Sequence, residues 1–342
     1  MNTPESRAAI ESCADILRSG GLVAFPTETV YGLGANALDS AAAARIFAAK
    51  QRPSWDPVIV HIAGTVEANP MFEALVTDVP DRAHKLMRAF WPGPLTLLLP
   101  RSAAVPDAVT AGRPLVGIRM PAHPVAFELI RIAGVPIAAP SANTFSHTSP
   151  TTAAHVLEDL DGRIDAILDA GPTLHGLEST VLDPCQSPML IYRPGAITAE
   201  QIRAVSGEVE IFSDQAPIAG EVIEALPSPG VGLRHYAPRA RLILVDAPIR
   251  DLPQKLAHAV ALYPKERVGI MIPEGLNVTA GSGEIVFRWG RWDAPEEMAR
   301  LLYAGLRTLD SEGCAVIVCP VPPGDGIGAA ILDRLRKAAR QI

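Results

Sequence analysis

The spacing of apolar residues alternates between helical and strand-like along the first two thirds of the chain. Residues 5–19 carry apolar side chains at helical spacing and end at two glycines. The apolar run from Gly21 to Phe25 then predicts a buried strand that leads into a polar, hydroxyl-rich turn closed by Gly32 and Gly34. The same criteria predict helices over residues 39–50, 80–90, 123–133 and 151–160, and strands over 58–62, 95–99, 115–120, 135–139, 164–168 and 189–192. Alternating strands and helices indicate an α/β fold.

The pattern changes between residues 213 and 238. This stretch is rich in proline, glycine and alanine, which predicts an extended linker. A second alternation follows, with strands predicted over 241–245, 268–272 and 315–319, and helices near 251–262, over 295–311 and from 327. We therefore expect two domains, 1–212 and 240–342, joined by a linker over 213–239.

Composition and charge narrow the function classes. The 342 residues are 48% hydrophobic and 20% charged, with a net charge of −7, so a stable complex with nucleic acid is not expected. The first residues do not form a signal peptide, and no apolar stretch is long enough to span a bilayer, which favours a cytoplasmic protein. The four cysteines form no C-x-x-C pair, and we expect them to be reduced and mostly buried.

Candidate chemistry follows the first predicted strand. Residues 24–34 read Ala-Phe-Pro-Thr-Glu-Thr-Val-Tyr-Gly-Leu-Gly, and polar residues at the carboxyl end of a strand are typical of ligand sites in α/β sheets. An ordinary strand-to-helix turn is the alternative. Lys50 and Arg52 then stand at a predicted helix end, and His61 lies inside the next strand.

Common nucleotide and metal signatures do not fit the chain. It has no G-x-x-x-x-G-K-[ST], no H-E-x-x-H and no cysteine–histidine cluster. Gly32, Gly34 and Ala37 match G-x-G-x-x-A loosely, but no acidic residue follows about 20 positions later. A P-loop is excluded, and a dinucleotide fingerprint is only weakly indicated.

Several motifs in order resemble the YrdC/Sua5 family, over essentially the whole chain. They are residues 24–34 and 50–61, Trp91-Pro92-Gly93-Pro94-Leu95-Thr96, Arg119-Met120-Pro121, Pro140-Ser141-Ala142-Asn143, Glu178-Ser179-Thr180, Arg193-Pro194-Gly195 and the linker segment 228–238. The resemblance implies a twisted mixed-sheet domain with a concave site and a small Rossmann-like C-terminal α/β domain. It also implies synthesis of L-threonylcarbamoyladenylate from L-threonine, bicarbonate and ATP, for the threonylcarbamoyl modification of adenosine 37 in tRNA.

The resemblance assigns two groups of site residues. Lys50 and Arg52 correspond to the phosphate-binding pair and are the expected catalytic residues; a solvated helix end is the alternative for them. The full set implied for ATP is Lys50, Arg52, Asp56, Leu115, Ser141, Asn143, Ser149, Arg193, His235 and Tyr236. The set implied for L-threonine is Thr29, His61, Arg119, Ala139 and Ser179.

Most of these residues have plainer alternatives. His61 could be a satisfied core histidine, and Ser149 could be a helix N-cap. Ser141 and Asn143 could belong to an ordinary turn, Arg193 could be a surface arginine, and Ser179 could cap a strand. For Arg119, a guanidinium is the natural partner of the amino-acid carboxylate.

Two positions depart from the family pattern. Asp56 stands where asparagine or lysine is common, and its carboxylate would repel phosphates unless Mg²⁺ or a nearby cation compensates. Leu115 replaces a common threonine, so any contact it makes with the nucleotide is apolar or through the backbone. Mg²⁺ is expected through the ATP phosphates, with no metal site built from protein side chains.

The linker and the partners complete the expectations. In two-domain relatives, the segment that corresponds to residues 234–236 folds over the active site as a lid; packing between domains is the alternative. A transient hand-off of product to the transferase that modifies tRNA is also possible. A non-catalytic RNA-binding module of the same fold is the alternative function; a carbamoyl-adenylate enzyme of the hydrogenase-maturation type would need extra domains that are not seen here.

Overall fold

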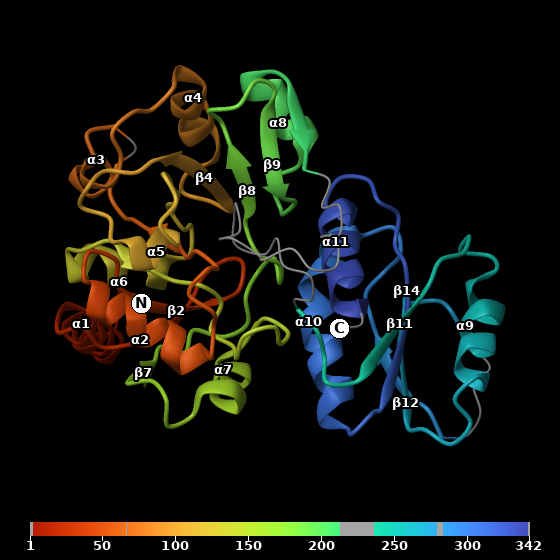
Figure 1. The fold of residues 1–342 in the computed structure, drawn as a ribbon. Helices are drawn as coiled ribbons and strands as arrows, with labels where there is room; N and C mark the ends of the chain where they lie inside the picture. Colours follow the sequence, from red (N-terminus) through yellow and green to blue (C-terminus); the bar gives the residue numbers. More distant parts are fainter. Residues whose placement is uncertain (1–2, 66, 213–235, 279–282, 341–342) are drawn as a thin grey trace. The chain divides into compact units, whose positions relative to one another are not determined.

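The computed structural model describes residues 3–65, 67–212, 236–278 and 283–340 (Figure 1). The chain forms two compact units. Described residues up to 212 make up the N-terminal unit, apart from segments 146–149 and 175–177. Those two segments group with residues 236–340 in the C-terminal unit, which the sequence did not predict.

The N-terminal unit is built on a ten-stranded sheet. Its strands are β1 (Val23–Pro26), β2 (Tyr31–Asn36), β3 (Ile59–His61), β4 (Leu95–Pro100), β5 (Leu115–Arg119), β6 (Ile137–Ala138), β7 (Ala166–Ile167), β8 (Thr180–Asp183), β9 (Met189–Arg193) and β10 (Val209–Ile211). The order across the sheet is β10-β9-β8-β4-β5-β3-β6-β2-β1-β7. Parallel and antiparallel neighbours both occur, so the predicted mixed sheet is confirmed.

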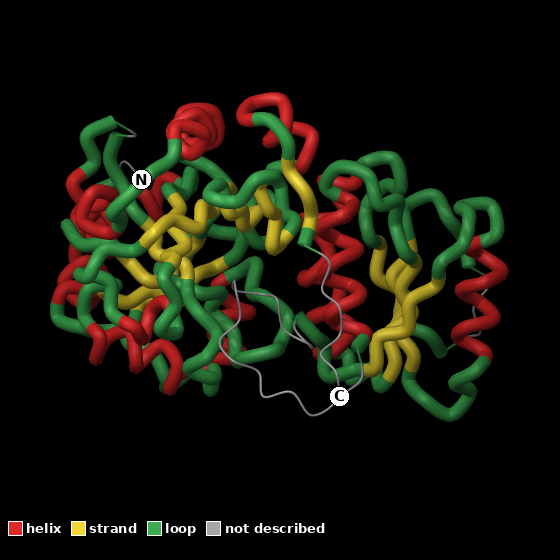
Figure 2. Tube along the Cα trace, turned by 45° about the horizontal axis from the view of Figure 1, so that its top comes forward, coloured by secondary structure: helices red, strands yellow, loops and turns green. Residues whose placement is uncertain are grey.

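Helices lie around this sheet (Figure 2). They are α1 (Pro4–Arg18), α2 (Ser40–Lys50), α3 (Pro70–Leu75), α4 (Asp81–Phe90), α5 (Asp107–Thr110), α6 (Pro124–Ala133), α7 (Ala153–Leu160) and α8 (Ala199–Ser206). Side chains of successive strand residues point to opposite faces. Val23 and Phe25 accordingly pack in a core with α1 and α6, whereas Ala24 packs in a second core with α2.

The first predicted turn differs from the structure. The glycines that were expected to close a polar turn lie inside β2, which pairs antiparallel with β1, so the polar turn is shorter and spans residues 27–30. Gly34 is required there because a Cβ would stand 2.7 Å from the Phe25 ring. Residues 27–30 are therefore the loop of a hairpin and not a strand-to-helix turn.

The topology brings the ends of three strands together on the same side of the sheet, where the strands begin or end. β5 is antiparallel to β4, β4 is parallel to β8, and β8 is antiparallel to β9. The end of β5, the start of β8 and the end of β9 therefore meet. Arg119, Ser179 and Arg193 lie at these ends.

The C-terminal unit is a small α/β domain. Its strands are β11 (Arg241–Val245), β12 (Val268–Ile272), β13 (Ile285–Arg288) and β14 (Val316–Pro320), and its helices are α9 (Leu252–Ala261), α10 (Pro295–Ser311) and α11 (Gly328–Ala339). The strands are parallel in the order β11-β14-β12-β13. Within this unit α9 covers one face of the sheet, and α10 and α11 cover the other (Figures 1 and 2). The Rossmann-like prediction is confirmed.

The four cysteines are free and mostly buried, as predicted. Cys13, Cys314 and Cys319 are buried and free, whereas Cys185 is free and exposed. No helix among the described residues is long and apolar enough to cross a lipid bilayer.

Candidate active site

Arg119, at the end of β5, is the centre of a buried polar cluster. Its Nη1 donates to Oγ1 of Thr29 at 2.9 Å, and its Nη2 donates to Oε1 of Glu28 at 2.6 Å. Its Nε donates to the carbonyl of Gly93 at 3.2 Å. The structure therefore brings together two residues that the resemblance assigned to L-threonine, Thr29 and Arg119.

Glu28 completes this cluster and was not among the predicted site residues. Its second carboxylate oxygen accepts the backbone N–H groups of Ala122 and His123. Burial acts to raise the pKa of Glu28, but the charge and hydrogen bond of Arg119 and the backbone donors outweigh it and hold the pKa below its ordinary value. The sequence did contain a signal for Glu28. A buried Arg119 in an apolar strand requires a carboxylate partner, and Glu28 is the acidic residue of the motif at residues 24–34.

His61 lies at the end of β3, directly opposite Arg119 in the register of β3 and β5. Its ring meets the Phe25 ring edge-on, with centroids 6.3 Å apart. Burial lowers the pKa of His61 to about 3, and the positive charge of Arg119 adds to the effect. The imidazole is therefore neutral at physiological pH, and its buried Nδ1 has no hydrogen-bond partner among the described residues.

Two predicted site residues are apolar and contribute packing. Ala139 is buried just after β6, and its N–H donates to the carbonyl of Ile59 at 2.8 Å. Leu115, at the start of β5, packs against a small cluster formed by Ile59, Leu98 and Val181. The prediction that Leu115 contacts a ligand through apolar or backbone atoms stays a prediction.

Lys50 joins the second group of predicted residues. Asp39 caps the start of α2, and Gln51 in a left-handed conformation ends it, so Lys50 is the last helical residue. Its Nζ donates to the carbonyls of Ser141 and Asn143. Only 1% of Lys50 is exposed, so the alternative of a solvated helix end is wrong.

Arg52, two residues beyond the end of α2, forms a buried ion pair with Asp56. Nη2 of Arg52 lies 2.9 Å from Oδ2 of Asp56, and the guanidinium also donates to the carbonyls of Asp56 and Pro57. The cation needed to compensate Asp56 is thus present. Burial nevertheless raises the pKa of Asp56, against the opposing charges of Arg52, Lys50 and Arg193.

Arg193 interacts with a residue from each predicted group: its charge acts on Asp56, and it binds Ser179. It is buried at the end of β9 and is therefore not a surface arginine; it donates to the carbonyl of Ser179 at 3.0 Å and to Oγ of Ser179 at 3.1 Å. The Ser179 hydroxyl lies 2.7 Å from that of Thr96, which was also not predicted as a site residue. Gly195 allows this approach, because a Cβ there would stand 2.3 Å from the backbone nitrogen of Thr180.

Three predicted nucleotide contacts lie in the C-terminal unit or outside the described residues. Ser149 is buried in segment 146–149, and the N-cap of α7 is Thr152, so the capping alternative for Ser149 is wrong. Tyr236 is buried in the C-terminal unit, stacked on Tyr303 with the Arg334 guanidinium 5.0 Å from its ring centroid. His235 lies outside the described residues.

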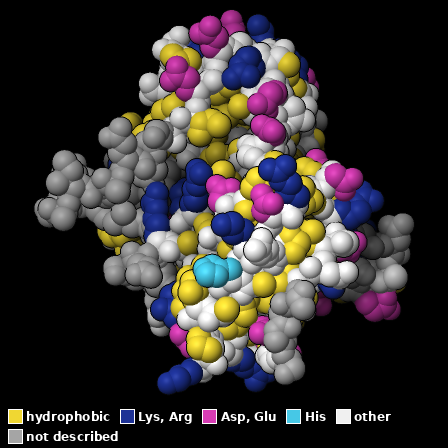
Figure 3. Space-filling view, turned by 90° about the vertical axis from the view of Figure 1, so that its right-hand side faces the viewer, with side chains coloured by type: hydrophobic (Ala, Val, Ile, Leu, Met, Phe, Trp, Pro, Cys, Tyr) yellow, Lys and Arg dark blue, Asp and Glu magenta, His cyan; other side chains and the backbone are white. Residues whose placement is uncertain are grey.

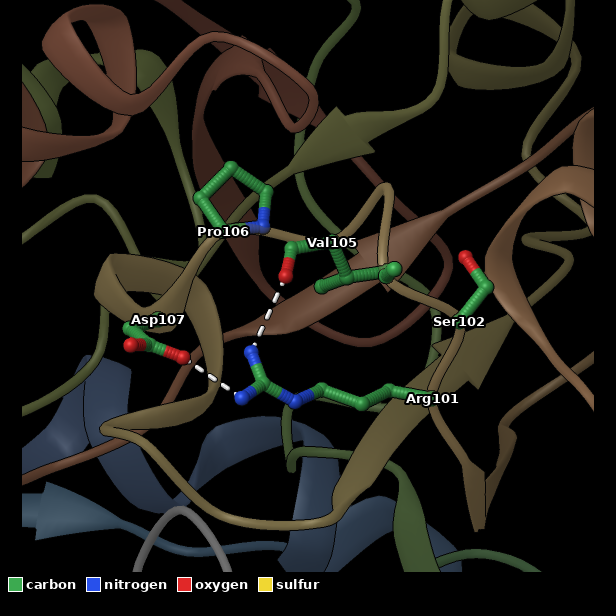
Figure 4. Close-up of a pocket in the computed structure, with 6 residues that line it drawn as sticks. Arg101, Ser102, Val105, Pro106 and Asp107 are labelled. Carbon is green, nitrogen blue, oxygen red and sulfur yellow. Dashed lines mark hydrogen bonds and ion pairs between the residues drawn. The ribbon is translucent and has the colours of Figure 1, made fainter.

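The described residues include a surface cavity but no cluster of metal ligands. The described residues contain no group of three or more histidine, cysteine, aspartate or glutamate side chains arranged to hold a metal ion. A cavity of about 360 Å³ is lined by Arg101, Ser102, Ala103, Val105, Pro106 and Asp107 (Figure 4). Arg101 there pairs with Asp107 and donates to the carbonyl of Val105, and none of the predicted site residues lines this cavity.

Comparison with known proteins places this arrangement among relatives. Residues 15–195 match the Sua5–YciO–YrdC family model, described as "Telomere recombination", and residues 197–340 match the "Threonylcarbamoyl-AMP synthase, C-terminal domain" model. A threonylcarbamoyl-AMP synthase of Pyrococcus abyssi is 43% identical over 96% of this chain and 94% of its own length. One of Bacillus subtilis is 44% identical over 96% of this chain and 92% of its own length.

A solved structure agrees with both sequence matches. The crystal structure of P. abyssi Sua5 complexed with L-threonine superimposes with a TM-score of 0.88, at 43% identity, and the match covers 96% of this chain and 94% of that one. The fold, both domain matches and the full-length relatives lead to one conclusion. This chain belongs to the Sua5–YciO–YrdC family, in the form that carries a Sua5 C-terminal domain.

Proposed function

We propose that this chain is an L-threonylcarbamoyladenylate synthase, which condenses L-threonine, bicarbonate and ATP to threonylcarbamoyl-AMP and pyrophosphate for the modification of adenosine 37 in tRNA. Full-length relatives named threonylcarbamoyl-AMP synthase support the proposal. One structural observation carries it: Arg193 donates hydrogen bonds to Ser179 of the proposed amino-acid site, and its charge also acts on Asp56, the partner of Arg52. A nucleotide and an amino acid bound at these two groups would be neighbours.

The proposed phosphate site consists of Lys50, Arg52 and Arg193. All three cations are buried and already donate to backbone carbonyls, so their positions are fixed before any ligand binds. Preorganised cations in a dry site stabilise charge more strongly than mobile cations in water. Phosphate oxygens of ATP would replace these carbonyls as hydrogen-bond acceptors of the three cations. Contacts with the rest of the nucleotide would come from Ser141, Asn143, Ser149 and Leu115.

The proposed L-threonine site consists of Arg119, Thr29, Ser179, His61 and Ala139. Within the described parts of the chain, three of the five guanidinium N–H groups of Arg119 have acceptors, and the other two would bind the substrate carboxylate. The neutral imidazole of His61 adds no charge and offers its unpartnered Nδ1 to the substrate. These groups bind and orient without forming a covalent intermediate.

The reaction needs positioning more than it needs protein nucleophiles. The amine of L-threonine forms an N–C bond with bicarbonate, and water leaves. A carbamate oxygen then attacks the α-phosphorus, and the bond to pyrophosphate breaks with its electron pair on the leaving oxygen. Mg²⁺ would bind through the ATP phosphates and neutralise their charge, while Asp56 adds a carboxylate beside Lys50, Arg52 and Arg193.

The proposed lid extends to the linker residues His235 and Tyr236. A solved P. abyssi Sua5 variant carries alanine in place of an adjacent histidine and tyrosine, which marks such a pair as of interest in that relative. Because Tyr236 is only 1% exposed, removing its ring would destabilise the C-terminal unit and confuse the test. Tyr236→Phe, which keeps the packing, is the variant that isolates a role of the hydroxyl in adenylate formation.

The alternative, a non-catalytic RNA-binding module, has weaker support. Figure 3 shows acidic and basic side chains intermixed with hydrophobic ones on the face that it draws. Together with the net charge of −7, this does not favour a phosphate-binding surface. An RNA shift that depends on salt, without adenylate formation, would favour the module.

We also propose the domain division 1–212, 213–239 and 240–342, a cytoplasmic location, and transient transfer of product to the enzyme that modifies tRNA. The C-terminal family match begins earlier, at residue 197. It therefore includes α8 and β10, although β10 pairs with β9 in the N-terminal sheet.

The test is incorporation of radiolabelled bicarbonate into an adenylate by the purified full chain with ATP, Mg²⁺ and L-threonine. We expect product from the wild type, and loss of product in Lys50→Ala and Arg52→Ala proteins that remain folded. Lys85→Ala, which removes an exposed lysine of α4, is the control and should retain activity. A folded wild type that forms no threonine-dependent product would refute the proposal.

A further inference from the structure

Two threonine hydroxyls face each other in the β1–β2 hairpin loop. Oγ1 of Thr27 lies 2.8 Å from Oγ1 of Thr29, and both residues are buried. Thr29 belongs to the proposed L-threonine site, whereas Thr27 has no assigned role. We propose that Thr27 is a positioning residue: it fixes the direction of the Thr29 hydroxyl so that Thr29 can only accept a hydrogen bond from the substrate.

The first step concerns the proton of Thr27. A hydroxyl carries one proton, and a carbonyl oxygen can only accept. Oγ1 of Thr27 lies 2.7 Å from the carbonyl oxygen of Val30, so Thr27 donates its proton there. The backbone N–H groups of Thr29 and Val30 share one lone pair of the Thr27 oxygen, at the longer distances of 3.2 and 3.3 Å, which leaves its other lone pair for a second hydroxyl.

The second step concerns the proton of Thr29. Because the Thr27 proton is already donated, the short contact between the two hydroxyls is made by the proton of Thr29. Nη1 of Arg119 lies 2.9 Å from the Thr29 oxygen and can only donate to it. Arg119 is itself held by Glu28 and Gly93, so it does not turn away.

The consequence is a site with a defined polarity. The Thr29 oxygen has given its proton to Thr27 and one lone pair to Arg119, and its second lone pair has no partner among the described residues. It therefore accepts an N–H or O–H group and excludes a carboxylate. If the proposed function holds, on which this inference rests, Thr29 contacts the amino group or the hydroxyl of L-threonine, while the carboxylate goes to Arg119.

The first experiment measures the dissociation constant of L-threonine by calorimetry on the full chain. Thr27→Val removes the acceptor for the Thr29 proton and should weaken binding about tenfold, the loss expected for one buried hydrogen bond. Thr27→Ser keeps the hydroxyl and should bind within about twofold of the wild type. The dissociation constant of ATP should be unchanged in both, which shows that the variants are folded. If Thr27→Val does not fold, Thr27→Cys, with its weak donor and acceptor, replaces it.

A double-mutant cycle separates positioning from a general structural role. If Thr27 acts through Thr29, then Thr27→Val should have no further effect on L-threonine binding in a Thr29→Val background. A purely structural role predicts two independent losses that multiply to about a hundredfold. That result, or binding by Thr27→Val within about twofold of the wild type, would overturn the proposal.

Two analogues identify the donor group. 3-Hydroxybutanoate lacks the amino group of L-threonine, and L-2-aminobutanoate lacks its hydroxyl. The affinity for one of them should no longer depend on Thr27, because that analogue has lost the group that donates to Thr29. If both analogues retain the full dependence on Thr27, the proposal is wrong. A wild type that binds no L-threonine at all would count against the proposed function and not against the orientation of the hydroxyls.

Discussion

Two buried arginine–carboxylate pairs in the N-terminal unit respond to burial in opposite ways. Glu28 and Arg119 are 2.6 Å apart, and Asp56 and Arg52 are 2.9 Å apart. Each of the four side chains is at most 5% exposed. Yet the pKa of Glu28 lies below its ordinary value, whereas that of Asp56 lies above.

The difference comes from the remaining hydrogen bonds of each carboxylate. Oε1 of Glu28 accepts a hydrogen bond from Arg119, and Oε2 accepts two backbone N–H groups. The corresponding oxygen of Asp56, Oδ1, has no partner among the described residues. An ion pair offsets its desolvation cost only when its other lone pairs are also satisfied. The comparison teaches that the arginine alone does not determine the charge state of its partner.

The largest expected effect comes from deleting each carboxylate. Glu28→Ala leaves the charge of Arg119 buried and two N–H groups without an acceptor, so we expect a loss of about 3–5 kcal/mol in the free energy of unfolding at pH 7. Asp56→Ala should cost less than about half as much, since Arg52 keeps two carbonyl acceptors. Urea unfolding measures both, and equal losses would contradict the comparison. Glu11→Ala, at an exposed pair on α1, is the control and should cost less than about 0.5 kcal/mol.

The next effect is the dependence of stability on pH. Because the folded-state pKa of Glu28 is lowered, its stabilisation is present above the ordinary pKa of 4.5 and is lost as pH falls through the folded value. Asp56 has a raised pKa, so its ionisation destabilises the fold as pH rises from 3.8 through the folded value.

Conservative variants should reveal these opposite signs. Glu28→Gln should be less stable than the wild type at pH 7, and this difference should shrink as pH falls below the ordinary pKa of 4.5. The stability of Asp56→Asn should increase relative to that of the wild type as pH rises. Unfolding free energies of the wild type and both variants, measured between pH 3 and 7, test these predictions. If the difference between variant and wild type changes with pH in the same direction for both variants, the explanation is wrong.

The smallest effect concerns ATP. Asp56 places a negative charge beside Lys50, Arg52 and Arg193, so Asp56→Asn should tighten ATP binding severalfold without changing the affinity for L-threonine. Parallel calorimetric titrations with the two ligands measure this. Weaker ATP binding would mean that the position of Arg52 depends on the full charge of Asp56.

Much of the fold could be predicted because local patterns agree with tertiary packing. Asp39 and Lys50 bound a helix whose alanines and Ile46 are buried, and the sequence predicts it nearly to the residue. β2 was missed because Gly32 and Gly34 disfavour a strand. The requirement for glycine at position 34 arises from the Phe25 ring, which only the folded structure brings close.

The candidate site was predictable in part for a similar reason. Motif resemblance identified residues such as Lys50, Arg119 and Ser179, which the structure places in buried hydrogen-bonded groups. It did not identify Glu28 or Thr27, whose importance lies in which atoms they orient. The role of Glu28 depends on its 2.6 Å contact with Arg119, 91 positions away, and the role of Thr27 depends on the direction of hydroxyl protons within one loop; the sequence pattern encodes neither.

The bonds from Arg193 to Ser179 also bear on the order of events during synthesis. The two hairpin-forming strands β8 and β9 supply these residues, and β8 joins the sheet beside β4, more than 80 positions earlier. A nascent chain that ends before Met189 lacks β9, the strand that carries Arg193. Such long-range pairing forms late and slowly, so an emerging N-terminal fragment would hold lysine and arginine groups without the means to act on a nucleotide until nearly 200 residues had left the ribosome.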